Sequence, residues 1–509
     1  MIQMIAVPIS IVPISTVLIN PTTGESNASG NSAPSDALVP LCIDLDDSLL
    51  RSDLLFEAFA HSLRYEPQMA VGFVVRLLRD GKAAAKTWLA DRGSFQVALV
   101  PVHHDVVDFI RHQVEEKKRD VYLVTASPQK WADLAGARVG MFKECIGSDS
   151  NRNLKGARKA QYLVDRFGKG GFDYLGDSEA DFEVWRKSRA AYVVSSEESF
   201  VRRVKDIVPV EGVISGRKPY SLRLLAKSLR VHQWIKNILI FLPVVAAHMI
   251  GNFGICWHAM LAFLSFSCAA STVYLLNDLC DLESDRQHRT KHTRPLASCE
   301  LRIQDALILA PLLIVISFAL AASLSGLFVL VLIAYLVMTT LYSFWLKRRA
   351  MVDIVVLSGL YTTRIVAGAS ATAIPVSTWL FSFSMFFFFS LACAKRYGEL
   401  ASKDEAETQV PGRGYYYGDR ELIGLLGVSS AVTSVLVLAL YVTAQEVVRL
   451  YSHPALLLLT CPLVLLWISR IWLTAFRDQL DDDPIVHALQ YKGSYIIGTA
   501  FFIILLSAK

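Results

Sequence analysis

Several short segments carry acidic, hydroxyl or basic side chains in patterns that suit phosphate chemistry. The first, Asp44-Leu45-Asp46-Asp47-Ser48, directly follows the apolar, strand-like run of residues 39–43. Side chains at positions i and i+2 of an extended chain point to the same side, so Asp44 and Asp46 can face one substrate. One carboxylate can then attack phosphorus while the other exchanges a proton with the leaving oxygen.

Later segments supply the other groups of a phosphoryl-transfer site, namely a hydroxyl, a lysine and two more carboxylates. They are Thr125 after the apolar run 121–124, Lys155 before the helical stretch 157–167, and Asp177 and Asp181 after the run 172–175. Lys159 is an alternative for the lysine. Lys155 is preferred because it lies at a helix start, where the helix dipole favours an anion.

In this order the segments resemble the four signatures of the haloacid dehalogenase superfamily, over residues 39–215. The resemblance implies a Rossmann-like α/β phosphatase domain at 39–220, with a helical cap at about 51–100. Alternating strands and helices predict a parallel sheet whose site lies at the carboxyl ends of the strands. The usual threonine four residues after the nucleophile is Ser48 in this chain.

The same resemblance assigns a role to each group. Asp44 is implied as the nucleophile that forms an aspartyl-phosphate, and Asp46 as the general acid/base. Thr125 and Lys155 would bind the phosphoryl oxygens. A Mg²⁺ ion would be held by Asp44, Asp177, Asp181 and the backbone carbonyl of Asp46.

A second group of acids ends a long apolar run: Asn277-Asp278-Leu279-Cys280-Asp281-Leu282-Glu283-Ser284-Asp285. Spacings of three and four residues place Asn277, Asp278, Asp281 and Asp285 on one face of a helix. Such oxygen ligands suit Mg²⁺, which commonly shares its coordination with substrate phosphates. A solvated helix end explains this pattern poorly, because a deeply placed membrane carboxylate costs about 2.5–3.5 kcal/mol.

From about residue 234 the chain becomes a series of apolar runs long enough to cross a bilayer. Lys and Arg concentrate in the loops after the second, fourth and sixth runs, and such loops stay cytoplasmic. We therefore expect a bacterial-type inner membrane protein with its amino-terminal domain inside and its carboxyl terminus outside. The nine predicted spans are 235–250, 257–279, 302–322, 326–346, 351–373, 378–395, 421–444, 454–475 and 492–507.

The aspartate-rich motif and the following Arg294-Pro295-Leu296-Ala297-Ser298 resemble the UbiA-type prenyltransferase superfamily, over residues 225–509. Aromatic prenyltransferases of this type carry a second aspartate-rich motif after the sixth span. Here that place reads Lys395-Arg396-Tyr397-Gly398-Glu399-Leu400. Cations hold phosphate directly, whereas paired acids hold it through a metal.

Two further stretches, residues 230–237 and 361–368, add a resemblance to the decaprenyl-phosphate phosphoribosyltransferase branch. That resemblance implies phosphoribosyl diphosphate and polyprenyl phosphate as substrates, with Mg²⁺ on Asn277, Asp278, Asp281 and Asp285. Asp278 and Asp281 would be the catalytic members of the motif. The candidate substrate-binding residues are Arg230, Gln233, Lys236, Asn237, Arg294, Arg364, Lys395, Arg396 and Glu399.

Together the two parts suggest transfer of 5-phosphoribose to the lipid, followed by removal of the 5-phosphate, in the supply of a lipid-linked arabinofuranose donor. Alternatives are an unrelated or inactive phosphatase domain, an aromatic prenyltransferase of a quinone or heme pathway, and a transporter whose intramembrane acids mark an ion path. The net charge of +5 comes without a continuous basic face, which excludes nucleic acid as a partner. The sequence leaves open whether the chain forms a homo-oligomer. Residues 1–38 are expected to be a flexible lead without a function.

Overall fold

The computed structural model describes residues 39–149, 153–401, 408–410, 412–448, 451–480, 484, 487 and 491–508. The predicted flexible lead, residues 1–38, lies outside the described residues. In the amino-terminal part, apolar runs form strands and amphipathic stretches form helices between them.

A six-stranded parallel sheet forms the centre of the amino-terminal part, in the order β3-β2-β1-β4-β5-β6. The prediction of a parallel sheet is therefore confirmed. The chain adds β2 and β3 on one side of β1 and then β4, β5 and β6 on the other, so the strand order reverses beside β1. The strands are β1 (Leu41–Ile43), β2 (Val121–Pro128), β3 (Glu144–Ser148), β4 (Asp173–Gly176), β5 (Ala191–Val194) and β6 (Val210–Ile214).

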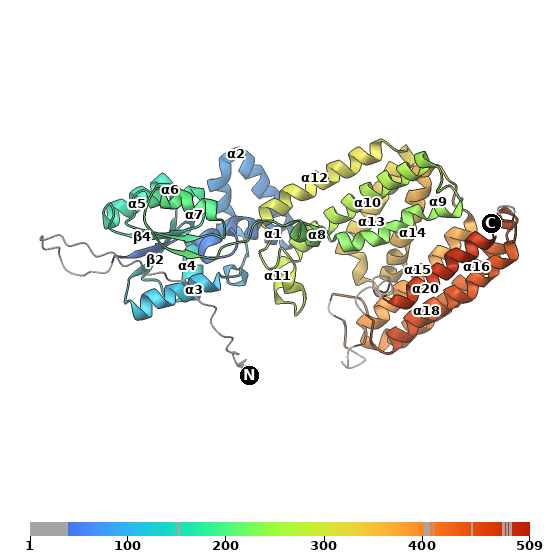
Figure 1. Cartoon of the computed structure of the whole chain (residues 1–509). Coiled ribbons are helices and arrows are strands. Elements are labelled where there is room, and N and C mark those ends of the chain that lie inside the picture. The colour runs from blue at the N-terminus through green and yellow to red at the C-terminus, as the bar shows by residue number, and fades with distance from the viewer. Residues whose placement is uncertain are drawn as a thin grey trace, which may run out of the picture. The chain divides into compact units, whose positions relative to one another are not determined.

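Alternate side chains of the strands enter two different hydrophobic cores. Leu41 and Ile43 of β1 pack with residues of α3 and α4, whereas Cys42 packs with residues of α5, α6 and α7 on the opposite face. Figure 1 shows α5, α6 and α7 on one side of the strands and α3 on the other. These helices are α3 (His104–Arg111), α4 (Gln129–Val139), α5 (Ala157–Phe167), α6 (Phe182–Trp185) and α7 (Glu198–Lys205).

Two helices occupy most of the segment predicted to be a helical cap. They are α1 (Leu54–Tyr65) and α2 (Pro67–Arg92). The Asp53 carboxylate accepts a hydrogen bond from Leu55 N at 2.8 Å and so caps the start of α1. Gly81 interrupts α2 with φ +82°, a backbone conformation that glycine adopts without a steric penalty.

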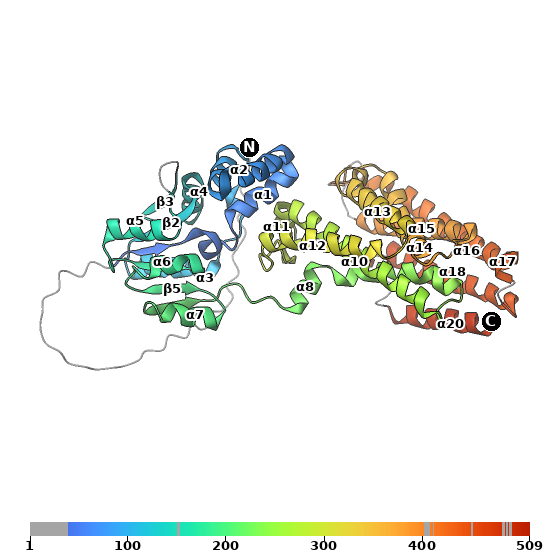
Figure 2. The same ribbon diagram turned by 90° about the horizontal axis from the view of Figure 1, so that it is seen from above.

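The rest of the chain, beyond α8 (Leu222–Ser228), is a helical membrane part, whose helices are seen from above in Figure 2. Among the described residues, seven helical segments are long and apolar enough to cross a membrane, so the chain is a multi-pass membrane protein. The predicted first and ninth spans correspond to the shorter apolar segments Val231–Ala246 and Lys492–Ala508. The seven are Phe253–Cys280 (α10), Ile303–Ala322 (α12), Gly326–Phe344 (α13), Val352–Thr372 (α14), Thr378–Glu399 (α15), Tyr417–Thr443 (α16, which itself begins at Arg420) and Pro454–Phe476 (ending in α18, Thr460–Phe476).

Short helices complete the membrane part. The first apolar segment consists of the tight helical stretch Val231–Phe241 and α9 (Leu242–Ala246). Gly368 of α14 packs against it so closely that an added Cβ would lie 1.9 Å from the carbonyl oxygen of Ile240. Close approach of two helix backbones needs such a small residue. The others are α11 (Leu282–Gln287), α17 (Gln445–Val448) and α20 (Lys492–Ala508).

Candidate functional site

Three acidic side chains gather at the carboxyl ends of the central strands. Asp44 follows β1, while Asp177 and Asp181 follow β4, the strand that pairs directly with β1. One carboxylate oxygen of each lies within 4.8 Å of those of the other two. An open α/β sheet forms its ligand crevice where the strand order reverses, and these residues lie at that point. We call this group the acid cluster.

Lys159 is the cation that contacts the acid cluster. Its Nζ lies 2.8 Å from Asp44 Oδ1 and 2.8 Å from the hydroxyl oxygen of Tyr174, and the side chain is buried. The structure thus brings the alternative, Lys159, to Asp44, whereas Lys155 is exposed just before α5, and the phosphoryl-binding role of Lys155 stays a prediction. The helix dipole acts at both positions, whereas only Lys159 points from the inner face of α5 toward the end of β1.

The acid cluster holds more negative charge than its neighbours neutralise. Burial raises the pKa of Asp44 to about 7, although the ammonium of Lys159 acts in the opposite direction. Burial and the nearby carboxylates raise the pKa of Asp177 well above its usual value. Three crowded carboxylates beside a single ammonium favour binding of a further cation, and their oxygen atoms suit Mg²⁺. Asp44, Asp177 and Asp181 therefore fit a Mg²⁺ ion by donor type and charge.

The loop after β4 holds Asp177 in place. One Asp181 carboxylate oxygen accepts hydrogen bonds from the backbone N–H groups of Asp177 and Ser178, at 3.3 and 3.2 Å. The other accepts one from the Tyr174 hydroxyl at 2.9 Å. Ser48, where the resemblance expects threonine, donates a hydrogen bond to Asp177 Oδ1 at 3.0 Å. Asp181 thus fixes the loop as well as contributing charge.

Asp46 contacts three hydrogen-bond donors. They are Lys86 Nζ at 3.0 Å, Ser127 Oγ at 2.5 Å and Leu54 N at 3.0 Å. Burial alone would raise the pKa of Asp46, but the Lys86 ammonium and these hydrogen bonds hold it below its usual value. Lys86 belongs to α2, so the cap segment contributes a side chain that the sequence analysis did not identify. No motif or spacing connects it with Asp46.

Thr125 lies buried in β2, close in sequence to the end of that strand. Its Oγ1 accepts a hydrogen bond from the backbone N–H of Ser127 at 3.0 Å. The side chain of Ser127 in turn reaches Asp46. Thr125 therefore supports Ser127 in this structure, and its predicted contact with a phosphoryl oxygen stays a prediction.

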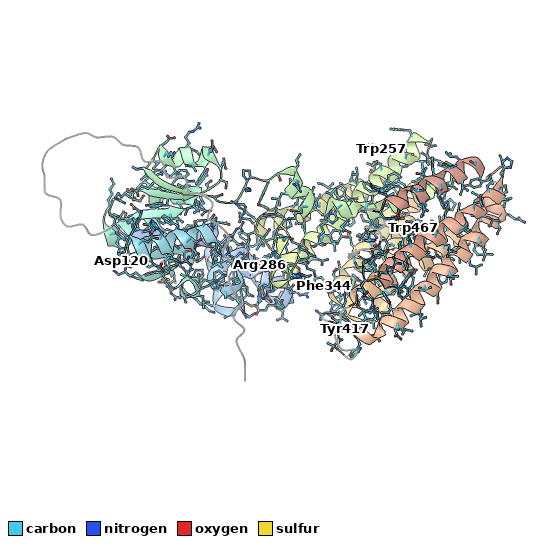
Figure 3. All side chains as sticks on the ribbon, turned by 60° about the horizontal axis from the view of Figure 1, so that its bottom comes forward. Asp120, Trp257, Arg286, Phe344, Tyr417 and Trp467 are labelled. Atoms are coloured by element: carbon cyan, nitrogen blue, oxygen red, sulfur yellow. The ribbon has the colours of Figure 1, made fainter. Side chains whose placement is uncertain are left out.

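The second group of acids lies where α10 ends and α11 begins. Backbone hydrogen bonds from Asp281 N to Asn277 O and from Asp285 N to Asp281 O, each 2.8 Å, continue the helical path between these helices. Asp278 and Asp285 consequently reach the same partner, Arg294, at 3.1 and 2.6 Å. Figure 3 labels Arg286, which follows Asp285 on α11.

Arginines neutralise this aspartate-rich motif. Arg230 donates a hydrogen bond to Asp278 at 2.5 Å, and Arg64 of α1 lies 3.6 Å from Asp281. Within the described part of the chain, the acids of the motif do not converge as tightly as the acid cluster does. Asp278 and Asp285 already share one cation, the guanidinium of Arg294, so this group of side chains attracts positive charge. Its carboxylate and amide oxygens are ligands that suit Mg²⁺. The amide of Asn277 donates to Ser343 Oγ at 3.1 Å, which leaves its oxygen as a donor for a metal.

Three predicted substrate-binding residues lie together on α14 and the first apolar segment. Arg364 is buried, and its Nε donates to Asn237 Oδ1 at 2.8 Å. The ring of Tyr361 faces two cations, with Arg364 5.6 Å and Lys236 5.8 Å from its centroid. Gln233 is half-buried in the same segment. The close packing at Gly368 accounts for this grouping.

Arg396 belongs to a buried ion-pair network. It is 1% exposed, and its guanidinium pairs with Asp353 at 2.7 Å and with Glu399. Tyr415 donates a further hydrogen bond to Asp353 at 2.7 Å. Among the described residues, Nε and Nη2 of Arg396 are buried without a hydrogen-bond partner, so its ion pairs do not use all of its donors. The substrate-binding roles predicted for Arg396, Glu399 and the partly exposed Lys395 stay predictions.

A bundle of apolar helices that carries an aspartate-rich motif beside arginines is the architecture of a multi-pass membrane protein. Residues 238–484 match the model of the UbiA prenyltransferase family, so the chain contains a domain of that family. The uncharacterized protein y4nM of Sinorhizobium fredii is 35% identical over 465 residues, which cover 91% of this chain and 90% of that protein.

Two other relatives match a smaller share of the chain. The nodulation protein NoeC of Azorhizobium caulinodans is 32% identical over 294 residues, 55% of this chain and 92% of that protein. The decaprenyl-phosphate phosphoribosyltransferase of Mycobacterium tuberculosis is 39% identical over 180 residues, 35% of this chain and 60% of that protein. The similarity to the mycobacterial enzyme thus spans about three fifths of its length.

Proposed function

We propose that the chain transfers 5-phosphoribose from phosphoribosyl diphosphate to a polyprenyl phosphate, and that its α/β part then removes the 5-phosphate. The product would be polyprenyl-phosphoryl-ribose, used for an arabinofuranose donor. The observation that carries the proposal is the similarity to the mycobacterial phosphoribosyltransferase, which is 39% identical over 180 residues. The aspartate-rich motif with its two arginines supplies matching chemistry.

In the transferase step, a phosphate oxygen of the lipid forms a bond to C1 of the ribose, and the bond from C1 to the diphosphate oxygen breaks. Asn277, Asp278, Asp281 and Asp285 would hold Mg²⁺, which lowers the barrier by stabilising charge on the departing diphosphate. Arg230 and Arg294 contact Asp278 and lie where they can bind phosphate oxygens beside that ion.

In the phosphatase step, Asp44 attacks the phosphorus of the 5-phosphate, and the bond from phosphorus to O5 breaks. The protonated Asp46 would give its proton to O5 as this bond breaks, and the resulting carboxylate would take a proton from the water that hydrolyses the aspartyl-phosphate. Lys159 contacts Asp44 and can neutralise the transferred phosphoryl group. A Mg²⁺ ion at the acid cluster would supply further charge stabilisation.

A coupled pair of reactions gives a reason for the two parts to share one chain. Tethering raises the effective concentration of the second site near the product of the first. The proposal places both sites on the cytoplasmic side of a bacterial inner membrane, with nine spans. It counts the short segment Val231–Ala246 as the first, since eleven residues of 3₁₀ helix and five of α-helix extend about 30 Å.

The competing function is prenylation of an aromatic ring, with an unrelated phosphatase part. It is disfavoured because the stretch after the sixth predicted span carries Lys395 and Arg396 in place of a second group of acids. The purified chain is therefore to be incubated with labelled phosphoribosyl diphosphate, Mg²⁺ and polyprenyl phosphate, and its lipid product identified by mass spectrometry. A prenylated hydroxybenzoate or naphthoate made from a polyprenyl diphosphate, with no labelled lipid, would overturn the proposal.

A further inference from the structure

A cleft of about 470 Å³ opens onto the acid cluster beside Asp177. Asp47, which directly follows the general acid/base Asp46, lines it as well. The opposite wall is built from two segments outside the sheet, namely residues 217–220, which follow β6, and Arg302, which directly precedes the membrane-spanning helix α12. The phosphatase-like site therefore shares a cavity with the start of a membrane span.

Hydrogen bonds hold these two segments together. Arg217 donates to the Cys299 carbonyl oxygen at 3.0 Å and to Asp47 Oδ1 at 2.9 Å. The Tyr220 hydroxyl donates to Asp305, and it accepts from the backbone N–H of Arg302 at 3.3 Å. The wall is thus anchored both to the loop after β1 and to the first turn of α12.

Five Arg and Lys side chains line the cleft, against the four acids Asp47, Asp177, Glu179 and Glu197. Arg203 and Arg217 are paired with Glu179 and Asp47. Three other cations that line it, Arg51, Lys218 and Arg302, are exposed and form no ion pair among the described residues. A second anionic group would be attracted to them while a first phosphate occupies the acid cluster.

We infer that Arg51, Lys218 and Arg302 bind the phosphodiester of a lipid-linked sugar phosphate while its 5-phosphate lies at the acid cluster. This rests on the proposed phosphatase function and names its substrate class: a sugar monophosphate with a second phosphate ester that is anchored in the membrane. The position of Arg302 is the reason for choosing a lipid-linked substrate. An arginine that directly precedes a span lies at the membrane surface, where the phosphodiester of a lipid-linked sugar also lies.

Two soluble probes and the lipid test the inference in the full-length protein. Release of the 5-phosphate is measured from ribose 5-phosphate, from ribose 1,5-bisphosphate, and from polyprenyl-phosphoryl-ribose 5-phosphate in liposomes. For the bisphosphate and the lipid, Arg302→Gln should lower kcat/KM about fivefold more than for ribose 5-phosphate, as expected for one partly exposed ionic contact. The triple substitution of Arg51, Lys218 and Arg302 to Gln should give a larger difference.

A matched control is Arg202→Gln, because Arg202 lies on α7 next to Arg203 but lines a different cavity. It should change none of the three rates. Equal losses with all probes for Arg302→Gln, or no loss, would overturn the inference and leave the phosphatase proposal standing. A loss with the bisphosphate but not with the lipid would also overturn it, because the cleft would then serve a soluble substrate. Phosphate release that is unaffected by Asp44→Asn would overturn the phosphatase proposal itself.

Discussion

The guanidinium of Arg286 donates hydrogen bonds to both carboxylate oxygens of Glu57, at 2.9 and 2.7 Å. Glu57 lies on α1 of the cap segment, and Arg286 follows the last acid of the aspartate-rich motif. His61 contacts Glu283 at 2.7 Å. Together with Arg64, these α1 residues form one face of the helix, directed at α11 and its junction with α10. The cap segment thereby contacts the helices that carry the aspartate-rich motif.

We expect Glu57→Ala to destabilise the protein by about 3–5 kcal/mol, because it leaves a guanidinium buried without a counter-charge. Thermal unfolding of the purified protein, followed by size-exclusion chromatography, checks this. The double variant Glu57→Met with Arg286→Met should lose less than the single variant, since no buried charge remains. If Glu57→Ala is neutral, the pair does not hold the cap segment against α11.

The lysine of the acid cluster gives the second prediction. Lys159→Met should reduce phosphatase turnover by about a hundredfold or more, because Asp44 and the phosphoryl group lose a charge-assisted contact in a buried place. Lys155→Met should leave turnover within about twofold, since its side chain is exposed. Phosphate release from the lipid product measures both. The opposite pattern would restore the assignment based on the helix dipole.

The sequence carries enough information for the architecture and for part of each site. Short apolar runs that end in acids predict parallel strands with Asp44 and Asp177 at one edge, and long apolar runs predict the membrane helices. These features follow from local pattern and from the geometry of a parallel sheet. The choice between Lys155 and Lys159 depends on which face of α5 packs against the sheet. The local sequence does not show that orientation.

Other site residues had no signal in the sequence. Lys86 lies 40 positions from Asp46 and sits in a helix rich in other basic residues. Asp353 is a single acid at the start of α14, yet it determines what Arg396 can do. Glu57 and Arg286 are 229 positions apart. Such pairs depend on how elements pack, and periodicity along the chain says nothing about them.

The network around Arg396 gives the third prediction. Arg396→Met should lower stability by about 3–5 kcal/mol, because Asp353 and Glu399 lose their shared buried counter-charge. Lys395→Met should instead raise KM for phosphoribosyl diphosphate severalfold with little change in unfolding temperature. Steady-state kinetics and thermal unfolding of the two variants separate these effects. A well-folded Arg396→Met protein with a raised KM would support the substrate-binding role predicted for Arg396.

The fourth prediction concerns the metal of the transferase. Asp278→Asn and Asp281→Asn should each reduce transfer of phosphoribose by at least a hundredfold, since the diphosphate loses its metal ligand. Chelation of Mg²⁺ should have the same effect on the unmodified protein. Glu421→Gln, an exposed acid at the start of α16, is the control and should behave normally. Near-normal transfer by either aspartate variant would contradict the assignment of the site.

The last prediction separates the two activities within one chain. Asp44→Asn should leave the transfer of phosphoribose intact and make the lipid product retain its 5-phosphate. The amide keeps the shape of the carboxylate but is a far poorer nucleophile, so no aspartyl-phosphate forms. The matched control is Asp206→Asn, an exposed acid just after α7.

The mass of the lipid product decides the outcome. The unmodified protein and the Asp206→Asn variant should give a lipid that is lighter by one phosphate group than the Asp44→Asn product. If all three give the same 5-phosphorylated lipid, the α/β part does not act on the transferase product, and only the transferase proposal survives. If all three give the dephosphorylated lipid, Asp44 is not the nucleophile. These results differ in whether the acid cluster acts on the lipid product. The mass of one phosphate group distinguishes them.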